Sequence, residues 1–127
     1  MAPAAPAASA RPAAPEDRDR TLMVRKTLRS GQRVVFDGNV VIVGDVNAGA
    51  EVEAEGDVVV LGNLRGIVHA GCKGRTDAVV VALNLHAAQV RIGNLIGLVN
   101  SQKGYSNNAA VMARIHEGAV ATCLYGR

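Results

Sequence analysis

The sequence has 127 residues, enough for one domain, and a formal net charge of +3 from 14 Lys and Arg against 11 Asp and Glu. With no Trp, one Phe and two Tyr, any core must be filled by Val, Leu, Ile and Ala, and interspersed charges argue against a nucleic-acid-binding surface. No apolar run is long enough to span a membrane. Cys72 and Cys123 have neither metal-site nor disulfide-framework spacing, so we expect reduced thiols in a cytosolic protein.

The N-terminal residues are rich in Ala and Pro and end in a charged cluster over residues 16–20. This composition predicts a disordered linker over residues 1–20, followed by a folded domain over residues 21–127. A signal peptide is excluded because no basic start precedes an apolar stretch. Since linkers join two parts, we expect either a fragment or a natural form that lacks an N-terminal domain.

A ten-residue motif organises the folded part, because residues 37–46 (DGNVVIVGDV) recur with a period of 18 as residues 55–64 (EGDVVVLGNL). Every position matches in type: acid, Gly, Asn or Asp, four aliphatics, Gly, Asp or Asn, aliphatic. Residues 21–28 precede the repeat and are predicted to form a first short strand. Two units then run head to tail over residues 31–48 and 49–66, and a fixed period of this kind indicates a repeat architecture.

The later units are less regular. A third copy at residues 78–85 follows an insertion around residues 74–77, and a fourth, shorter unit covers residues 88–96. Residues 99–108 are polar and contain Gly, which predicts a loop. Residues 111–122 are predicted to form two short strands around a Glu-Gly turn.

Two folds compete for the repeated units. Asp37 and Gly38 could close a β-hairpin, or each unit could form three short strands of a β-solenoid coil. The matching of successive units favours the solenoid, in which a residue lies about 4.8 Å from its equivalent in the next coil. We therefore expect Gly44 to stack on Gly62 at a corner. Asp37 would stack unfavourably on Glu55, so that corner is expected to be exposed and splayed.

The repeated strands also predict an assembly. All four residues are apolar in the runs 40–43, 58–61 and 79–82, so half of each run must face outward. A broad outward apolar face predicts a two-fold homodimer; the alternative is cover by a loop or by the C-terminal segment. The register is not readable from the sequence, so the candidate dimer-face residues represent both possibilities: Val41, Ile42, Val59 and Val60.

No catalytic constellation is evident, and we expect neither an enzyme nor a cofactor or metal. His69, His86 and His116 are far apart and have no Cys or carboxylate at ligand spacing. Residues 66–73 superficially resemble a phosphate-binding loop, but the Lys is displaced by one position and no Ser or Thr follows it. A solenoid acyltransferase would have a hexapeptide rhythm and a catalytic His, whereas the period here is 18.

The best candidate for binding is the polar turn at residues 29–33 (RSGQR). Its two guanidinium groups, hydroxyl and amide could contact the carboxylates and backbone of a partner. The alternative is an ordinary solvated turn.

Several motifs in succession resemble the C-terminal domain of the septum site-determining protein MinC. They are RSGQ at residues 29–32, VGDVNAGAEV at 43–52, EGD at 55–57, LGNLRG at 61–66, HAG at 69–71 and RIG at 91–93. The resemblance covers roughly residues 29–96, with a fainter match at 113–118. It implies an all-β, right-handed β-helix of triangular section that dimerises through one face.

The resemblance also implies a function: a cell-division inhibitor module that binds the membrane ATPase MinD and, with it, the tail of FtsZ. It would be cytoplasmic, reach the inner membrane surface only through MinD, and have no nucleic-acid partner. The family motif maps MinD binding onto Arg29, Ser30, Gly31 and Gln32, with Gly49 one coil away. The family's N-terminal domain, which antagonises FtsZ polymers, has no counterpart in this sequence, and residues after 100 depart from the family pattern. The alternative function is a self-polymerising cytoskeletal scaffold similar to bactofilin, which would leave the RSGQ turn unexplained.

Overall fold

The computed structural model describes residues 20–86, 88–99 and 110–124, and all regular elements in these ranges are strands. The predicted linker at residues 1–20 lies outside them except for Arg20, and the predicted loop at 99–108 lies outside except for Val99.

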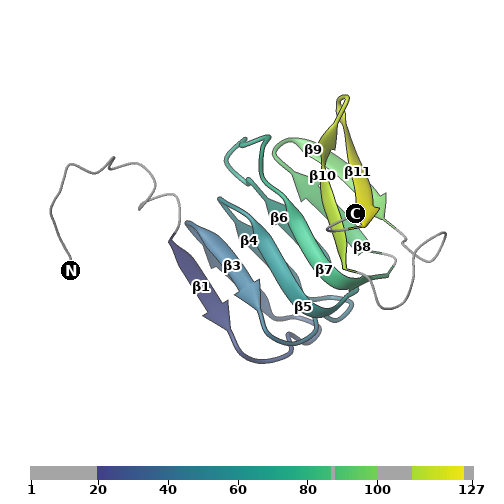
Figure 1. The fold of residues 1–127 in the computed structure, drawn as a ribbon. Coiled ribbons are helices and arrows are strands. Elements are labelled where there is room, and N and C mark those ends of the chain that lie inside the picture. The colour runs from purple at the N-terminus through teal and green to yellow at the C-terminus, as the bar shows by residue number, and fades with distance from the viewer. Residues whose placement is uncertain (1–19, 87, 100–109, 125–127) are drawn as a thin grey trace, which may run out of the picture.

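The strands wind into stacked coils and form two sheets (Figure 1). Sheet A has the strand order β1-β3-β5-β7-β10-β11, and sheet B has the order β2-β4-β6-β8-β9. Sheet A contains β1 (Thr21–Val24), β3 (Asn39–Ile42), β5 (Val58–Leu64), β7 (Val80–Leu85), β10 (Val111–His116) and β11 (Ala119–Leu124). Sheet B contains β2 (Arg33–Phe36), β4 (Glu51–Ala54), β6 (Ile67–Ala70), β8 (Ala88–Ile92) and β9 (Leu95–Val99).

Parallel pairing between successive coils confirms the predicted β-solenoid. Thr21 pairs with Asn39, and Val40 pairs with Val58, so both pairs keep the period of 18. The hairpin alternative is wrong, because β2 and β3 belong to different sheets.

The coils are not all of one length. Val58 pairs with Val80, an offset of 22 that exceeds the period by four, and the inserted positions lie in the corner between β6 and β7. Glu51 pairs with Ile67, an offset of 16 that falls short of the period by two. Corners can change length because the strands on either side keep their own pairing.

A third, narrow face closes the triangular section. It is formed by residues 25–29, 43–47, 61–65 and 83–86, and its coils are tied by bridges from Leu28 to Val46 and from Val46 to Leu64. We call this surface the third face. Its inward side chains meet those of the two sheets in a core whose fully buried members, among the described residues, are aliphatic, with the partly buried Phe36 packed against it. In sheet A, Val40, Ile42, Val58 and Val60 are all 0% exposed, as strand alternation requires.

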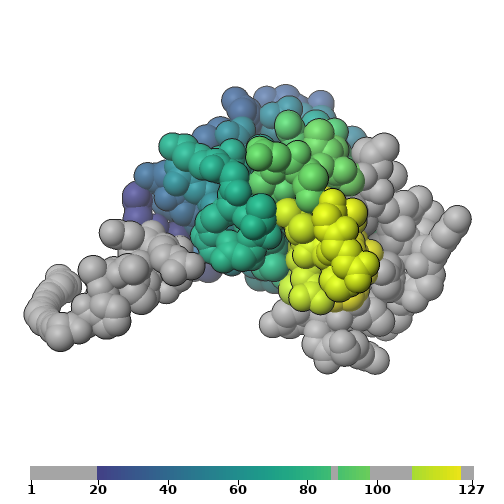
Figure 2. Space-filling view, turned by 90° about the horizontal axis from the view of Figure 1, so that it is seen from above, coloured from purple at the N-terminus to yellow at the C-terminus, as the bar shows by residue number. Residues whose placement is uncertain are grey.

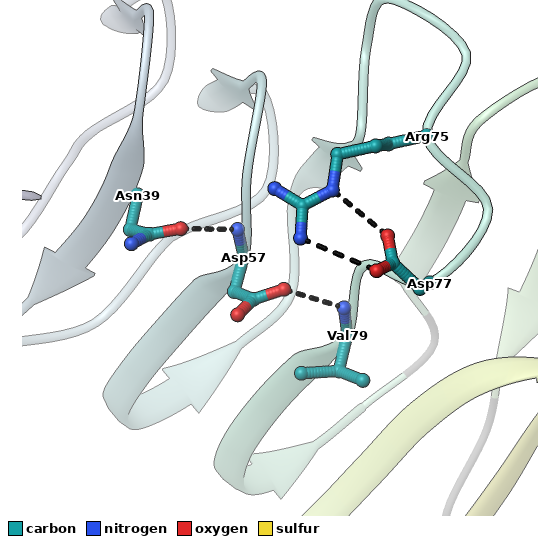
Figure 3. Close-up of polar contacts among 5 residues, drawn as sticks. All are labelled: Asn39, Asp57, Arg75, Asp77 and Val79. Carbon is teal, nitrogen blue, oxygen red and sulfur yellow. Dashed lines mark hydrogen bonds and ion pairs between the residues drawn. The ribbon is translucent and has the colours of Figure 1, made fainter. Parts of the chain in front are cut away.

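Polar side chains connect the coils at the corners. Asn39 Oδ1 accepts the backbone N–H of Asp57 at 2.8 Å, and Asp57 Oδ1 accepts the N–H of Val79 at 3.0 Å (Figure 3). Arg75 lies beside this ladder and its Nε donates to Asp77 at 2.8 Å; this hydrogen bond raises the pKa of the guanidinium. Asn39 and Asp57 thus each satisfy a backbone donor that the turn leaves without a strand partner.

The expected acidic clash at one corner is relieved by separate basic partners. Asp37 forms an ion pair with Arg20 at 2.9 Å, and Glu55 forms one with Lys73 at 3.2 Å. The Asp37 side chain is 56% exposed, as expected for a splayed corner. The Glu55 side chain is only 34% exposed, so the corner is less exposed at Glu55 than we expect from two stacked carboxylates.

Two antiparallel hairpins end the coil stack. β9 pairs back onto β8, so the predicted fourth unit ends at Ile92 and does not continue through Ile96. β10 runs antiparallel to β7 and pairs with β11, with a turn at Glu117 and Gly118 as predicted. Figure 2 shows this last hairpin (yellow) packed against the preceding segment (green).

Candidate partner-binding site

The turn from Arg29 to Gln32 lies at the corner between the third face and sheet B. The N–H of Gln32 donates to the carbonyl of Arg29 at 2.9 Å, and the N–H of Arg29 donates to Gln32 Oε1 at 2.7 Å. These reciprocal bonds close the turn. The Arg29 guanidinium and the Ser30 hydroxyl lie on exposed residues, where a partner can reach them.

Gly49 lies directly next to this turn on the following coil, as predicted. The N–H of Gly31 donates to the carbonyl of Gly49 at 3.0 Å, and both glycines have φ of +88°. A Cβ on Gly49 would collide with the Ser30 side chain. Gly49 is therefore required both by the left-handed backbone and by the close approach of the turn.

The second guanidinium of the predicted site is already engaged. Arg33 contacts Glu51 at 3.2 Å and Glu53 at 2.7 Å on the outer side of sheet B. Of the two guanidinium groups predicted for the site, one is thus ion-paired with carboxylates of the neighbouring coil. Arg29 remains as the cation that the turn presents.

The outer side of sheet A carries a continuous apolar row. Its members pair across five strands in the order Met23, Val41, Val59, Val81 and Met112. Beside it, at the corner with the third face, Val43, Leu61 and Leu83 are 40%, 44% and 44% exposed.

This register separates the candidate dimer-face residues. Val41 and Val59 point outward, whereas Ile42 and Val60 are 0% exposed in the core. The assignment of Ile42 and Val60 to an outward face is wrong, because alternation turns them inward.

The histidines and cysteines form no further centre within the described ranges. No group of three or more His, Cys, Asp or Glu there could hold a metal ion. His69 Nε2 lies 2.9 Å from the carbonyl oxygen of Gly93. Burial raises the pKa of the Cys72 thiol from its ordinary value of 9.0, and both Cys72 and Cys123 are free. No helix in the described part is long and apolar enough to cross a membrane.

Comparison with known families gives a clear match. The model of the septum formation inhibitor MinC, C-terminal domain, matches residues 22–122. A probable septum site-determining protein MinC of Symbiobacterium thermophilum is 52% identical over 93 residues, which are 73% of this chain and 41% of that protein. Its counterpart from Acetivibrio thermocellus is 61% identical over 72 residues, which are 57% of this chain and 32% of that protein. The chain therefore spans less than half the length of these relatives.

A solved structure has the same fold. The chain resembles one from the MinC:MinD cell division protein complex of Aquifex aeolicus, with a TM-score of 0.76 and 34% sequence identity. The similarity covers 86% of this chain and 89% of that chain.

Proposed function

Because the chain belongs to the family of MinC C-terminal domains, we propose that it is a cell-division inhibitor module that docks on the ATPase MinD. Its contact residues are Arg29, Ser30, Gly31 and Gln32, with Gly49 as their support. The observation that carries the proposal is the turn itself. Hydrogen bonds within the turn and to Gly49 hold its backbone, while Arg29 and Ser30 are exposed. The related chain from Aquifex aeolicus was solved in a complex named for MinC and MinD.

We also propose a homodimer through the outer side of sheet A. The apolar row from Met23 to Met112 crosses five of its six strands, and Met23 is 51% exposed in the single chain. A second copy of the same row is its natural complement, since a two-fold axis makes one patch self-complementary.

Membrane recruitment and action on FtsZ follow from the same proposal. Docking on MinD would bring a cytoplasmic dimer to the inner membrane surface and, there, to the FtsZ tail. Two turns per dimer would engage two MinD molecules, and the second engagement would be intramolecular and therefore favoured.

Replacing Arg29 by Ala tests MinD docking. We expect Arg29→Ala to abolish co-sedimentation with MinD, ATP and liposomes, because it removes the free cation of the turn, while the dimer is unchanged by light scattering. Arg91→Ala is the matched control, because Arg91 is an exposed arginine on the outer side of sheet B. Unchanged co-sedimentation of Arg29→Ala would refute the proposal. Filaments of the purified protein without MinD would favour the self-polymerising scaffold instead.

A further inference from the structure

Positive charge gathers on the outer side of the third face. Leu28, Val46 and Leu64 point into the core from this face, so the residues that flank them point out. One outward row therefore contains Arg29 and, two coils later, Arg65. At the strand spacing of about 4.8 Å, these two positions lie roughly 10 Å apart.

Two more cations begin the same face. Val43 donates its N–H to the carbonyl of Val24, which places Arg25 and Lys26 at the corner between sheet A and the third face. Arg25, Lys26, Arg29 and Arg65 are all exposed; we call these four residues the basic strip.

The charge of the basic strip is not compensated within the described residues. None of its four cations forms an ion pair there. The third face holds one acid, Asp45, whose Oδ1 accepts the N–H of Asn63 at 2.8 Å as part of a corner ladder.

Most other described cations form ion pairs, and the two exceptions, Arg91 of β8 and Arg114 of β10, lie on different sheets. Arg20 pairs with Asp37, Arg33 pairs with two glutamates of the next coil, Lys73 pairs with Glu55, and Arg75 pairs with Asp77. Among the described residues, the third face thus combines four unpaired cations with one acid, which gives it a net positive field. Such a field attracts a surface of opposite sign and speeds its association.

We infer that the docking surface for the ATPase extends from the turn across the basic strip, and that the partner surface lying on it is rich in carboxylates. This inference rests on the proposed function, because Arg29 belongs to both the turn and the strip. A specific interface buries about 800 Å² on each partner, which is far more than one four-residue turn offers. The third face continues directly from that turn, and its unpaired guanidinium and ammonium groups can pair with carboxylates of a partner.

Charge reversal away from the turn tests the inference. We would measure binding of the full chain to MinD with ATP, in solution, for Arg65→Glu and for the double variant Arg25→Glu/Lys26→Glu. Each should weaken binding about tenfold in ~0.1 M salt, mainly through a slower association rate. The loss should shrink toward ~1 M salt, where the Debye length is about 3 Å. Arg91→Glu is the control and should bind like the unaltered chain, because Arg91 is an exposed cation of sheet B, away from the strip.

The outcomes separate the inference from the proposed function. If the unaltered chain binds MinD, and Arg65→Glu and the double variant bind it equally well with the same salt dependence, the inference is overturned while the function stands. If the unaltered chain does not bind MinD, the function itself fails. A parallel measurement uses phosphatidylglycerol vesicles without MinD. Vesicle binding that the reversals abolish, with MinD affinity intact, would assign the strip to lipid and overturn the inference. Thermal melting of each variant confirms that it is folded.

Discussion

Replacing Val59 and Val60 separately by Asp tests both the strand register and the dimer face. Both are valines of β5, the third strand in the order of sheet A. Val59 lies in the outward apolar row, whereas Val60 is 0% exposed. The same substitution therefore falls on the proposed interface at Val59 and in the core at the adjacent Val60.

The two costs differ in kind. Val60→Asp forfeits about 1.5–3 kcal/mol of valine burial and places an unpaired carboxylate in an aliphatic core, at several kcal/mol more. The total is comparable with the whole stability of a domain, about 5–15 kcal/mol, so we expect an unfolded chain. Val59→Asp keeps its carboxylate in water in the single subunit, so that subunit should fold. In the dimer, symmetry buries two such carboxylates, and a loss of about 4 kcal/mol would raise the dimer Kd roughly a thousandfold.

Light scattering after size-exclusion chromatography measures the assembly, and circular dichroism in urea measures folding. We expect an unaltered dimer, a folded Val59→Asp monomer and an unfolded Val60→Asp chain. A Val59→Asp dimer with unchanged Kd, or an unaltered chain that is monomeric, would refute the dimer. A folded Val60→Asp chain beside an unfolded Val59→Asp chain would refute the register.

Three further predictions concern the corners. Gly49→Ala should lose more free energy of unfolding than Gly74→Ala, because both adopt positive φ but only a Cβ at Gly49 meets Ser30; equal losses in urea titrations would contradict this. Asp57→Ala should lower the free energy of unfolding by about 1–2 kcal/mol, because it leaves the N–H of Val79 without its acceptor. Asp57→Asn should lower it clearly less, because the amide oxygen can still accept that bond. Equal losses for the two variants would argue against the corner hydrogen bonds. The raised pKa of Cys72 predicts that the Cys72 peptide is alkylated more slowly at pH 8 in folded than in urea-unfolded protein, as mass spectrometry can measure. The free energy of unfolding should fall above about pH 9, since the unfolded chain loses that thiol proton first; a flat profile would contradict it.

The coil could be predicted because its determinants are periodic. Matching positions 18 apart in the first two units implied stacking, and an aliphatic core needed no long-range information beyond that period. The offsets of 16 and 22 residues between paired strands were harder to predict, because corners carry no repeated pattern and local turns set their length. The register of Val41 and Ile42 was undetermined because every residue in the run is apolar, so no polar position marks the outer side.

The site was only partly readable for a related reason. A family motif pointed to Arg29, but the motif alone did not reveal that Arg33 is neutralised. The period of 18 could have revealed this ion pair, because it places Arg33 beside Glu51 of the next coil. In the same way, two periods of 18 place Arg65 in one row with Arg29, which could have revealed the basic strip. The antiparallel end of β9 had no such signal, because a hairpin replaces the period there.

The corner between β6 and β7 has a practical consequence. It accommodates an excess of four over the period while Val58 and Val80 stay paired, and a Cβ on Gly74 would meet no atom within 4 Å. It lies on a different corner from the Arg29 turn. A small epitope or dye-labelling peptide inserted at Gly74 would therefore report where the module is in a living cell while its contact residues remain uncovered.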